Sequence, residues 1–143
     1  MSTPVDWDDL LRRAVEAAAR AYAPYSQLRV GVAALTTDGR LLQACNVENA
    51  SYGLGLCAEC GLVSLLHASG GGVLAALACR SGAGDLLMPC GRCRQLLWEH
   101  GGPDLLVDTP RGVLPMTEVL PDAFGARDLP SSSGAVTAGQ EGR

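Results

Sequence analysis

Near the start of the chain, apolar residues recur every three or four positions, which is the spacing of one face of an α-helix. The pattern predicts a helix over residues 6–22, with Asp6 as its N-cap and Pro24 just beyond its end. The apolar face of this helix consists of Leu11, Val15, Ala18 and Tyr22. We therefore expect an amphipathic helix that packs against the rest of the domain.

Sequence typical of β-strands follows this helix. The runs 28–36 and 40–45 are rich in apolar residues, and Thr37-Asp38-Gly39 between them is a turn sequence, so together they predict a hairpin. Polar side chains then replace apolar ones over residues 46–49. The end of a strand is a natural place for contacts with a ligand.

Helices and strands alternate through the rest of the chain. Residues 57–69 and 91–100 predict two further helices, each starting at or just after a cysteine, and 73–79 predicts a strand buried on both faces. Short strands are expected at 86–88, 105–107 and 113–116, and a helical turn at 117–120. This order predicts an α/β fold, a three-layer α-β-α sandwich with a mixed sheet of about five strands.

The composition indicates one domain followed by a tail. The chain has 143 residues, of which 48% are apolar, enough to bury a single core. We assign residues 1–129 to this domain. Residues 130–143 are mostly small or polar and cannot bury enough surface to become ordered, so we expect a disordered tail.

The charge pattern excludes several classes of function. The net charge is −4, and the basic residues are all arginines that form no stripe, so we expect no binding to nucleic acid. The absence of lysine excludes a lysine Schiff base and a lysine-containing phosphate loop. No export signal and no run of membrane-spanning length are visible, so we expect a cytoplasmic enzyme without a membrane partner.

Two cysteine motifs carry the candidate chemistry, Cys57-Ala58-Glu59-Cys60 and Pro89-Cys90-Gly91-Arg92-Cys93. Three thiolates on one cation would form a tetrahedral zinc site whose fourth position is open to water. A Cys or His followed at the second position by Glu, and later by Pro-Cys-x-x-Cys, is the signature of zinc-dependent nucleobase deaminases. The motifs therefore predict a site that activates water, with Glu59 beside the open position.

A closed structural zinc site is the alternative. In that case all four sulfurs would bind the metal, Glu59 would be a solvated helix residue, and the protein would be a non-catalytic interaction module. The 29 residues between Cys60 and Cys90 exceed the gap of about 15 to 20 usual in such sites, which favours the open site. Cys45 and Cys79 lie in apolar runs and are predicted to be small buried hydrophobes.

The motifs resemble those of the small homotetrameric cytidine deaminases, in a form similar to actinobacterial members. The resemblance covers about residues 21–129. The matching segments are Ala23-Pro24-Tyr25-Ser26, Val30-Gly31, Cys45-Asn46-Val47-Glu48-Asn49, Cys57-Ala58-Glu59, Pro89-Cys90-Gly91-Arg92-Cys93-Arg94-Gln95 and Leu120-Pro121-Asp122-Ala123-Phe124. The resemblance implies a Zn²⁺-dependent aminohydrolase of pyrimidine salvage. It would convert cytidine and deoxycytidine to uridine and deoxyuridine, with release of ammonia, by attack of zinc-bound hydroxide on the amine-bearing ring carbon.

The resemblance also implies a role for each site residue. Glu59 would be the catalytic proton carrier, and Cys57, Cys90 and Cys93 would hold the zinc. The substrate would be bound by Asn46, Glu48, Ala58, Leu28, Tyr52 and Phe124. Among these, Asn46 and Glu48 would contact the ribose, with Glu48 at its 3′ hydroxyl, and the Ala58 backbone N–H would meet the pyrimidine carbonyl. Tyr52 and Phe124 match residues that family members supply to a neighbouring subunit, so a homotetramer is expected.

Two positions depart from the family pattern. Leu28 stands where a phenylalanine usually stacks on the pyrimidine ring, so the aromatic face is lost. Cys60 stands where most tetrameric relatives carry an arginine that offsets the charge of the thiolates. Arg92, Arg94 or the helix N-termini could supply this offset, and Cys60 could also act as a spare ligand.

Leu28 also leaves room for another amine substrate, an antibiotic nucleoside of the blasticidin type. The sugar contacts expected of Asn46 and Glu48 favour the ordinary nucleoside. His67 and His100, the two histidines of the chain, sit at no ligand spacing from the cysteines. We assign both histidines to packing or to the surface.

Overall fold

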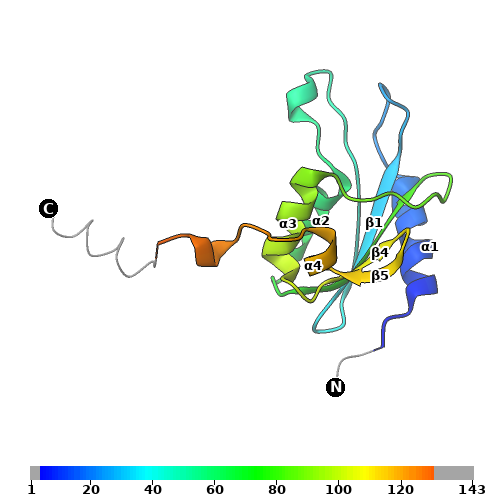
Figure 1. Ribbon diagram of the computed structural model, residues 1–143. Coiled ribbons are helices and arrows are strands. Elements are labelled where there is room, and N and C mark those ends of the chain that lie inside the picture. The colour runs from blue at the N-terminus through cyan, green and yellow to red at the C-terminus, as the bar shows by residue number, and fades with distance from the viewer. Residues whose placement is uncertain (1–3, 131–143) are drawn as a thin grey trace, which may run out of the picture.

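The computed structural model describes residues 4–130, which form three layers (Figure 1). Helix α1 (Trp7–Ala18) covers one face of a five-stranded sheet, and helices α2 (Ala58–Ala68) and α3 (Gly91–Gly101) cover the other. The three-layer α/β sandwich expected from the sequence is confirmed. None of the described helices has the length and apolar character needed to span a bilayer.

The sheet has the strand order β2-β1-β3-β4-β5. Its strands are β1 (Val30–Thr36), β2 (Leu41–Cys45), β3 (Leu74–Ser81), β4 (Leu106–Thr109) and β5 (Gly112–Pro115). Strand β1 pairs antiparallel with β2 and β3, and β4 pairs antiparallel with β5. Strands β3 and β4 are parallel, so the sheet is mixed, as predicted. The predicted hairpin is β1 and β2.

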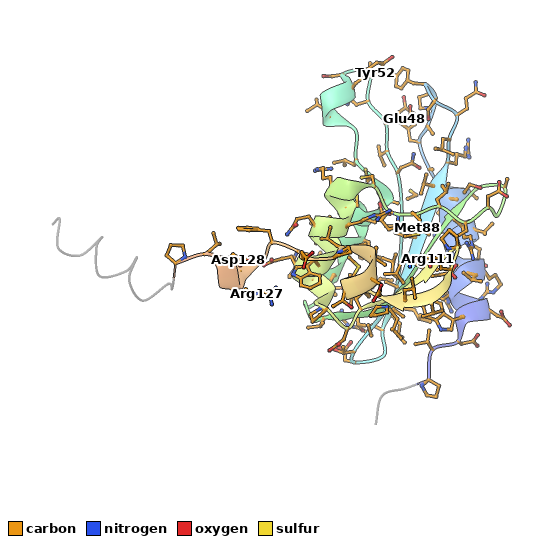
Figure 2. All side chains as sticks on the ribbon, in the orientation of Figure 1. Glu48, Tyr52, Met88, Arg111, Arg127 and Asp128 are labelled. Carbon is orange, nitrogen blue, oxygen red and sulfur yellow. The ribbon has the colours of Figure 1, made fainter. Side chains whose placement is uncertain are left out.

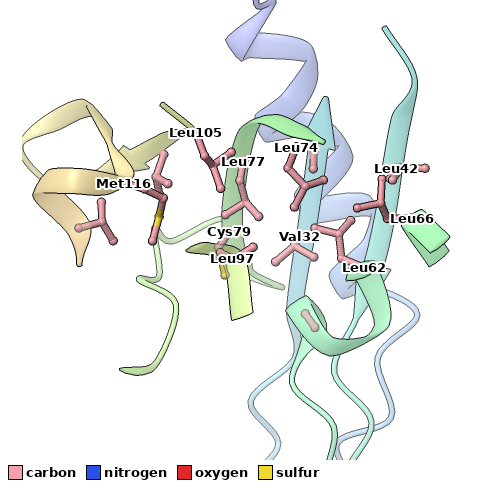
Figure 3. Packing of buried hydrophobic residues seen from close by; sticks show 14 residues of the cluster. Val32, Leu42, Leu62, Leu66, Leu74, Leu77, Cys79, Leu97, Leu105 and Met116 are labelled. Carbon is pink, nitrogen blue, oxygen red and sulfur yellow. The ribbon is translucent and has the colours of Figure 1, made fainter. Parts of the chain in front are cut away.

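The larger core lies between the sheet and helices α2 and α3 (Figure 3). It includes Val32, Leu42, Leu62, Leu66, Leu74, Leu77, Cys79, Leu97, Leu105 and Met116. The smaller core, between the sheet and α1, consists of Leu10, Ala14, Ala33, Ala76 and Ala78. Because neighbouring strand residues point to opposite faces, β3 contributes to both cores. The leucine-rich core therefore packs the two helices that begin at the cysteines.

Helix α1 differs from the prediction in its end and in its buried face. It is capped by Asp6, as expected, but ends at Ala18 because the backbone of Tyr22 pairs instead with the segment around Val47. Its buried residues are Leu10, Ala14, Ala17 and Ala18, so the predicted face was wrong by about one position. Small residues face the sheet because α1 approaches closely: a Cβ on Gly31 would lie 1.9 Å from the Ala14 carbonyl oxygen.

The short elements agree with the sequence prediction in part. Helix α4 (Met116–Val119) corresponds to the helical turn predicted at 117–120, and two 3₁₀ turns occur at Tyr52–Leu54 and Ala126–Asp128. The strand predicted at 86–88 is wrong, because Leu86 makes only an isolated bridge to Arg80. Strand β3 pairs with β1 along most of its length and with β4 only at Ala76 and Leu77, and the segment after Leu86 adds no further strand to it. The tail predicted over residues 130–143 lies outside the described residues except for Pro130.

Candidate active site

Three sulfur atoms meet where helices α2 and α3 begin. Cys57 and Cys90 directly precede α2 and α3, and Cys93 lies in the first turn of α3. The three sulfur atoms all lie within 4.8 Å of one another, close enough to bind one ion. Cys57 makes no side-chain capping hydrogen bond, so its sulfur remains available as a ligand. The structure thus brings together the three cysteines expected to hold zinc.

The electrostatics of this cluster fit a bound cation. Burial is the main cause that raises the pKa of the Cys57 and Cys93 thiols, and the Glu59 carboxylate raises both further. The pKa of Cys90 is lowered, chiefly by the backbone N–H of Cys93, as is usual for a thiol at a helix N-terminus. Three thiolates this close to a carboxylate need positive charge between them. The donor set therefore fits Zn²⁺, which readily accepts thiolate ligands.

Glu59 lies in the first turn of α2 and is only 4% exposed. Its carboxylate takes part in none of the salt bridges found within residues 4–130. Cys79, near the end of β3, faces Glu59. Burial is the main cause that raises the pKa of the Cys79 thiol, and the negative charge of Glu59 raises this pKa further. Burying a carboxylate without a basic partner is costly in a stable fold. Such a group beside three potential metal ligands is a candidate for the chemistry of the site.

Cys60 lies outside the cluster of three sulfurs. Its sulfur accepts a hydrogen bond from Nη1 of Arg92 at 3.4 Å, and the charge of Cys60 raises the pKa of Arg92. Arg94 is instead held by the backbone carbonyls of Pro89 and Val119. Of the two arginines considered as a charge offset, Arg92 is the one whose guanidinium contacts a cysteine sulfur. The grouping of three sulfurs also argues against the closed four-cysteine alternative.

A cavity of about 450 Å³ opens from the cysteines towards the loops beyond the sheet. Its lining includes eight residues expected in the site: Leu28, Asn46, Glu48, Tyr52, Cys57, Ala58, Glu59 and Cys90. Cys93 is fully buried, and Phe124 does not line the cavity. Ala58 is the first residue of α2, so its backbone N–H has no partner within the helix. A larger hollow, of about 570 Å³ and lined in part by Trp98 and Arg127, lies away from the cysteines.

At the outer end of the cavity, Glu48 is held in place by hydrogen bonds. Its carboxylate accepts from the backbone N–H of Tyr25 at 3.1 Å, the backbone N–H of Ser26 at 3.2 Å and the Ser26 hydroxyl. These bonds, with the Ser26 hydroxyl first, lower the pKa of Glu48. The group is therefore an ionised, oriented acceptor at neutral pH.

Asn46 anchors the entry of strand β1. Its Oδ1 accepts from the Val30 backbone N–H at 2.8 Å, and its Nδ2 donates to the Leu28 carbonyl at 2.9 Å. A primary amide carries two N–H donors, so one donor of Asn46 remains for a ligand. Asn46 thus fixes the backbone of Leu28 and can still bind substrate.

The aromatic residues of the predicted site are exposed in a single chain. Glu48 and Tyr52 lie on loops that project beyond the sheet (Figure 2). Tyr52 is 85% exposed and makes an edge contact with Tyr25, with ring centroids 6.5 Å apart. Phe124 is 57% exposed, and its carbonyl accepts a hydrogen bond from Gln95. The structure therefore does not bring Phe124 into the cavity of its own chain.

Sequence reasoning missed several apolar residues of the lining. Besides Cys79, they are Val30, Val47, Leu56, Leu87 and Met88. Cys79 is buried, as predicted, but it also lines the floor of the cavity beside Glu59. Its position near the end of a buried strand was the signal that could have revealed this. Leu87 and Met88 immediately precede the Pro-Cys motif, so their place in the site follows from that of Cys90.

Comparison with known proteins agrees with this geometry. Residues 5–108 match the family model described as the cytidine and deoxycytidylate deaminase zinc-binding region. The chain is 60% identical over 126 residues to a cytidine deaminase of Mycobacterium tuberculosis, covering 88% of this chain and 95% of that protein. A second relative, a cytidine deaminase of Halalkalibacterium halodurans, is 35% identical over 130 residues, with coverage of 87% and 98%.

Solved structures give the same result. The crystal structure of cytidine deaminase from Mycobacterium tuberculosis matches with a TM-score of 0.83 and 59% identity, covering 85% of this chain and 99% of that chain. That of cytidine deaminase from Mycobacterium leprae matches with a TM-score of 0.81 and 60% identity, covering 83% and all of that chain. With its three-cysteine cluster and buried glutamate, the chain belongs to the cytidine and deoxycytidylate deaminase family of zinc-binding proteins.

Proposed function

We propose that this protein hydrolyses the exocyclic amine of cytidine and deoxycytidine, producing uridine or deoxyuridine and ammonia. The observation that carries the proposal is the buried Glu59 beside the cluster of Cys57, Cys90 and Cys93, at the floor of a cavity with polar groups at its mouth. A zinc ion held by the three cysteines would lower the pKa of water from about 15.7 towards 7.

Glu59 is the proton carrier in this proposal. Its carboxylate accepts one proton from the attacking water and donates it to the ring nitrogen next to the amine-bearing carbon. It then accepts the second proton from the hydroxyl now on that carbon and donates it to the amine, which leaves as ammonia while the carbon–oxygen double bond forms. One carboxylate can fill both roles because it is a base when ionised and an acid once it has accepted a proton. Its burial, at 4% exposure, keeps bulk water from exchanging those protons.

The cavity orients the nucleoside from both ends. The unpaired N–H of Ala58, at the positive end of α2, is suited to the pyrimidine carbonyl. At the mouth, the free N–H of Asn46 and the ionised carboxylate of Glu48 are suited to ribose hydroxyls. A base without its sugar would leave these groups unpaired, so the cavity should favour nucleosides over free cytosine.

The proposal includes a homotetramer in the cytoplasm. Its support is the exposure of Tyr52 and Phe124, at 85% and 57%, which is unusual for aromatic residues expected in a binding site. A neighbouring copy could bury these side chains and complete the outer end of the cavity. The proposed catalytic unit is residues 1–129. Sedimentation of the zinc-loaded protein tests this part of the proposal, and a monomer at assay concentration would contradict it.

The fall in ultraviolet absorbance on deamination tests the activity. Zinc-loaded protein should turn over cytidine and deoxycytidine and leave blasticidin S unchanged. A preference for blasticidin S would establish the antibiotic nucleoside as the substrate. No turnover of any of the three by protein with one tightly bound zinc per chain would overturn the proposal and favour a structural zinc site.

A further inference from the structure

The two histidines of the chain meet at the far ends of the helices that carry the cysteines. His67 lies in the last turn of α2, and His100 lies in the last turn of α3. The Nε2 atom of His67 lies 3.1 Å from the Nδ1 atom of His100, and the ring centroids are 4.9 Å apart. The sequence assigned both residues to packing or to the surface, but the structure joins them across the two helices.

We infer that His67 and His100 bind a second divalent transition-metal cation, such as Ni²⁺ or Zn²⁺, at a site separate from the three cysteines. Imidazole nitrogens are good ligands for both ions. His67 follows Cys57 by ten residues, which corresponds to about 15 Å along a helix at 1.5 Å per residue. One ion therefore cannot bind both to the cysteines and to the histidine pair.

The geometry of the pair fits two ligands of one ion. Nitrogens bound at about 2.1 Å, with an angle at the metal a little over 90°, lie about 3.1 Å apart. With each ring centroid about 1.1 Å behind its nitrogen, the same angle places the centroids about 4.8 Å apart. The observed distances are 3.1 and 4.9 Å. A straight N–H···N hydrogen bond of this length would put the centroids farther apart, at about 5.3 Å, so the two rings do not lie along one line.

The surroundings of the pair also favour a cation. His67 is exposed and His100 is half-buried, so an ion can enter from solvent and keep water molecules as its remaining ligands. Burial, followed by the charge of His67, lowers the pKa of His100, which leaves the imidazole neutral and able to bind metal. The exposed Glu99 carboxylate beside His100 adds negative charge to the site.

Binding changes only the tautomer of the ring that donates the hydrogen bond. In the free pair, one ring donates its N–H to the other across the 3.1 Å contact. When the cation binds, that proton moves to the other nitrogen of the same ring, and both facing nitrogens present lone pairs to the metal. The ion then links the C-terminal ends of α2 and α3, so it should raise the thermal stability of the protein.

Nickel titration of the zinc-loaded protein tests this inference without relying on deamination. Calorimetry should show about one additional Ni²⁺ per chain, while the original zinc stays bound and no thiolate-to-nickel absorption appears. His67→Ala and His100→Ala should each weaken this binding at least about tenfold, and the melting temperature should rise with nickel only in the parent protein. If each variant retains the zinc bound by the three cysteines, that variant is folded.

Glu99→Gln is the matched control, because it keeps both imidazoles and removes only a nearby charge. It should weaken nickel binding by less than either histidine variant does. Three results would overturn the inference: no nickel uptake at millimolar concentration, nickel that displaces the zinc, or unchanged binding when both histidines are replaced.

Discussion

At the inner end of the cavity Cys93 and Glu59 are 0% and 4% exposed, whereas at the outer end Leu28 and Tyr52 are 50% and 85% exposed. The inner residues lie at the N-termini of two helices that pack on the leucine-rich core. The outer residues lie on loops joined mainly by isolated bridges such as Tyr22 with Val47. One chain therefore builds a rigid inner end, the proposed reaction centre, and leaves the proposed substrate-binding mouth exposed.

This difference explains how the work of the site is divided. Proton transfer and metal binding tolerate little movement of the ligands, and helix N-termini fixed by a core provide that rigidity. Sugar recognition needs groups that a nucleoside can reach, and loops provide access. Substitutions at the inner end should therefore abolish chemistry, whereas substitutions at the outer end should mainly change substrate affinity.

The largest expected effect comes from removing a zinc ligand. Cys93→Ser should release the metal and reduce deamination to background, because the site loses the fully buried member of its three sulfurs. Metal analysis and the ultraviolet assay measure both effects together. Cys60→Ser is the matched control, since its sulfur contacts Arg92 outside the cluster. Loss of zinc from the Cys60 variant as well would assign that residue a ligand role.

The next effect separates the proposed proton carrier, Glu59, from the metal ligands. Glu59→Gln keeps the shape of the buried side chain but removes its ability to accept a proton, so kcat should fall by about 10² to 10⁴ while zinc content is unchanged. Glu16→Gln on α1, on the opposite face of the sheet, serves as a control with normal kcat. A fall of less than tenfold at Glu59 would mean that another group carries the proton.

At the outer end, Glu48→Gln should act on substrate binding. The neutral amide lacks the charged carboxylate that accepts hydrogen bonds from Tyr25 and Ser26 and that is proposed to accept one from the ribose. The value of kcat/KM for cytidine should therefore fall by about 10- to 100-fold, mostly through a higher KM. Zinc content should remain at one per chain. The variant should also discriminate less between cytidine and cytosine. An equal fall for both substrates would show that Glu48 supports the loop rather than the sugar.

A smaller effect should appear in the pH profile. Hydrogen bonds from Ser26 hold the pKa of Glu48 below its ordinary value of 4.5. The stabilisation from these bonds is therefore fully present above pH 4.5 and is lost as the pH falls through the lower pKa of the folded protein. Ser26→Ala removes the hydroxyl group that lowers the pKa of Glu48 most. The pKa should therefore rise, and the acid limb of kcat/KM should move to higher pH. An acid limb that stays in place would show that it reports a different group.

The inner end of the site could be predicted from sequence because local spacing defines it. Cys57 and Glu59 belong to one helix start, and Cys90 and Cys93 to another, so only the meeting of two helices remained to be established. The floor residue Cys79 was predicted to be buried, but its contact with Glu59 depends on tertiary packing. No spacing rule encodes such a contact.

The rest of the fold required knowledge of long-range pairing. Periodicity alone extended α1 to Tyr22, whose backbone pairs instead with the loop around Val47. Because α1 lies close to Gly31, the buried face of this helix consists mainly of alanines. A prediction that looks for large apolar residues therefore assigns the wrong face of α1 to the core. The strand order of the sheet likewise arises from pairing between distant segments.

The smallest expected effect concerns the exposed wall of the mouth. Leu28 is 50% exposed and provides an apolar surface without a ring. Leu28→Phe should add stacking on the pyrimidine worth about 0.5–1.5 kcal/mol, which corresponds to a KM about 2- to 10-fold lower with little change in kcat. Leu65→Phe, on the exposed side of α2 and outside the cavity, is the matched control. If Leu28→Phe instead lowers kcat, the side chain affects how the base is oriented over Glu59, and the separation between the two ends of the cavity would not hold at this position.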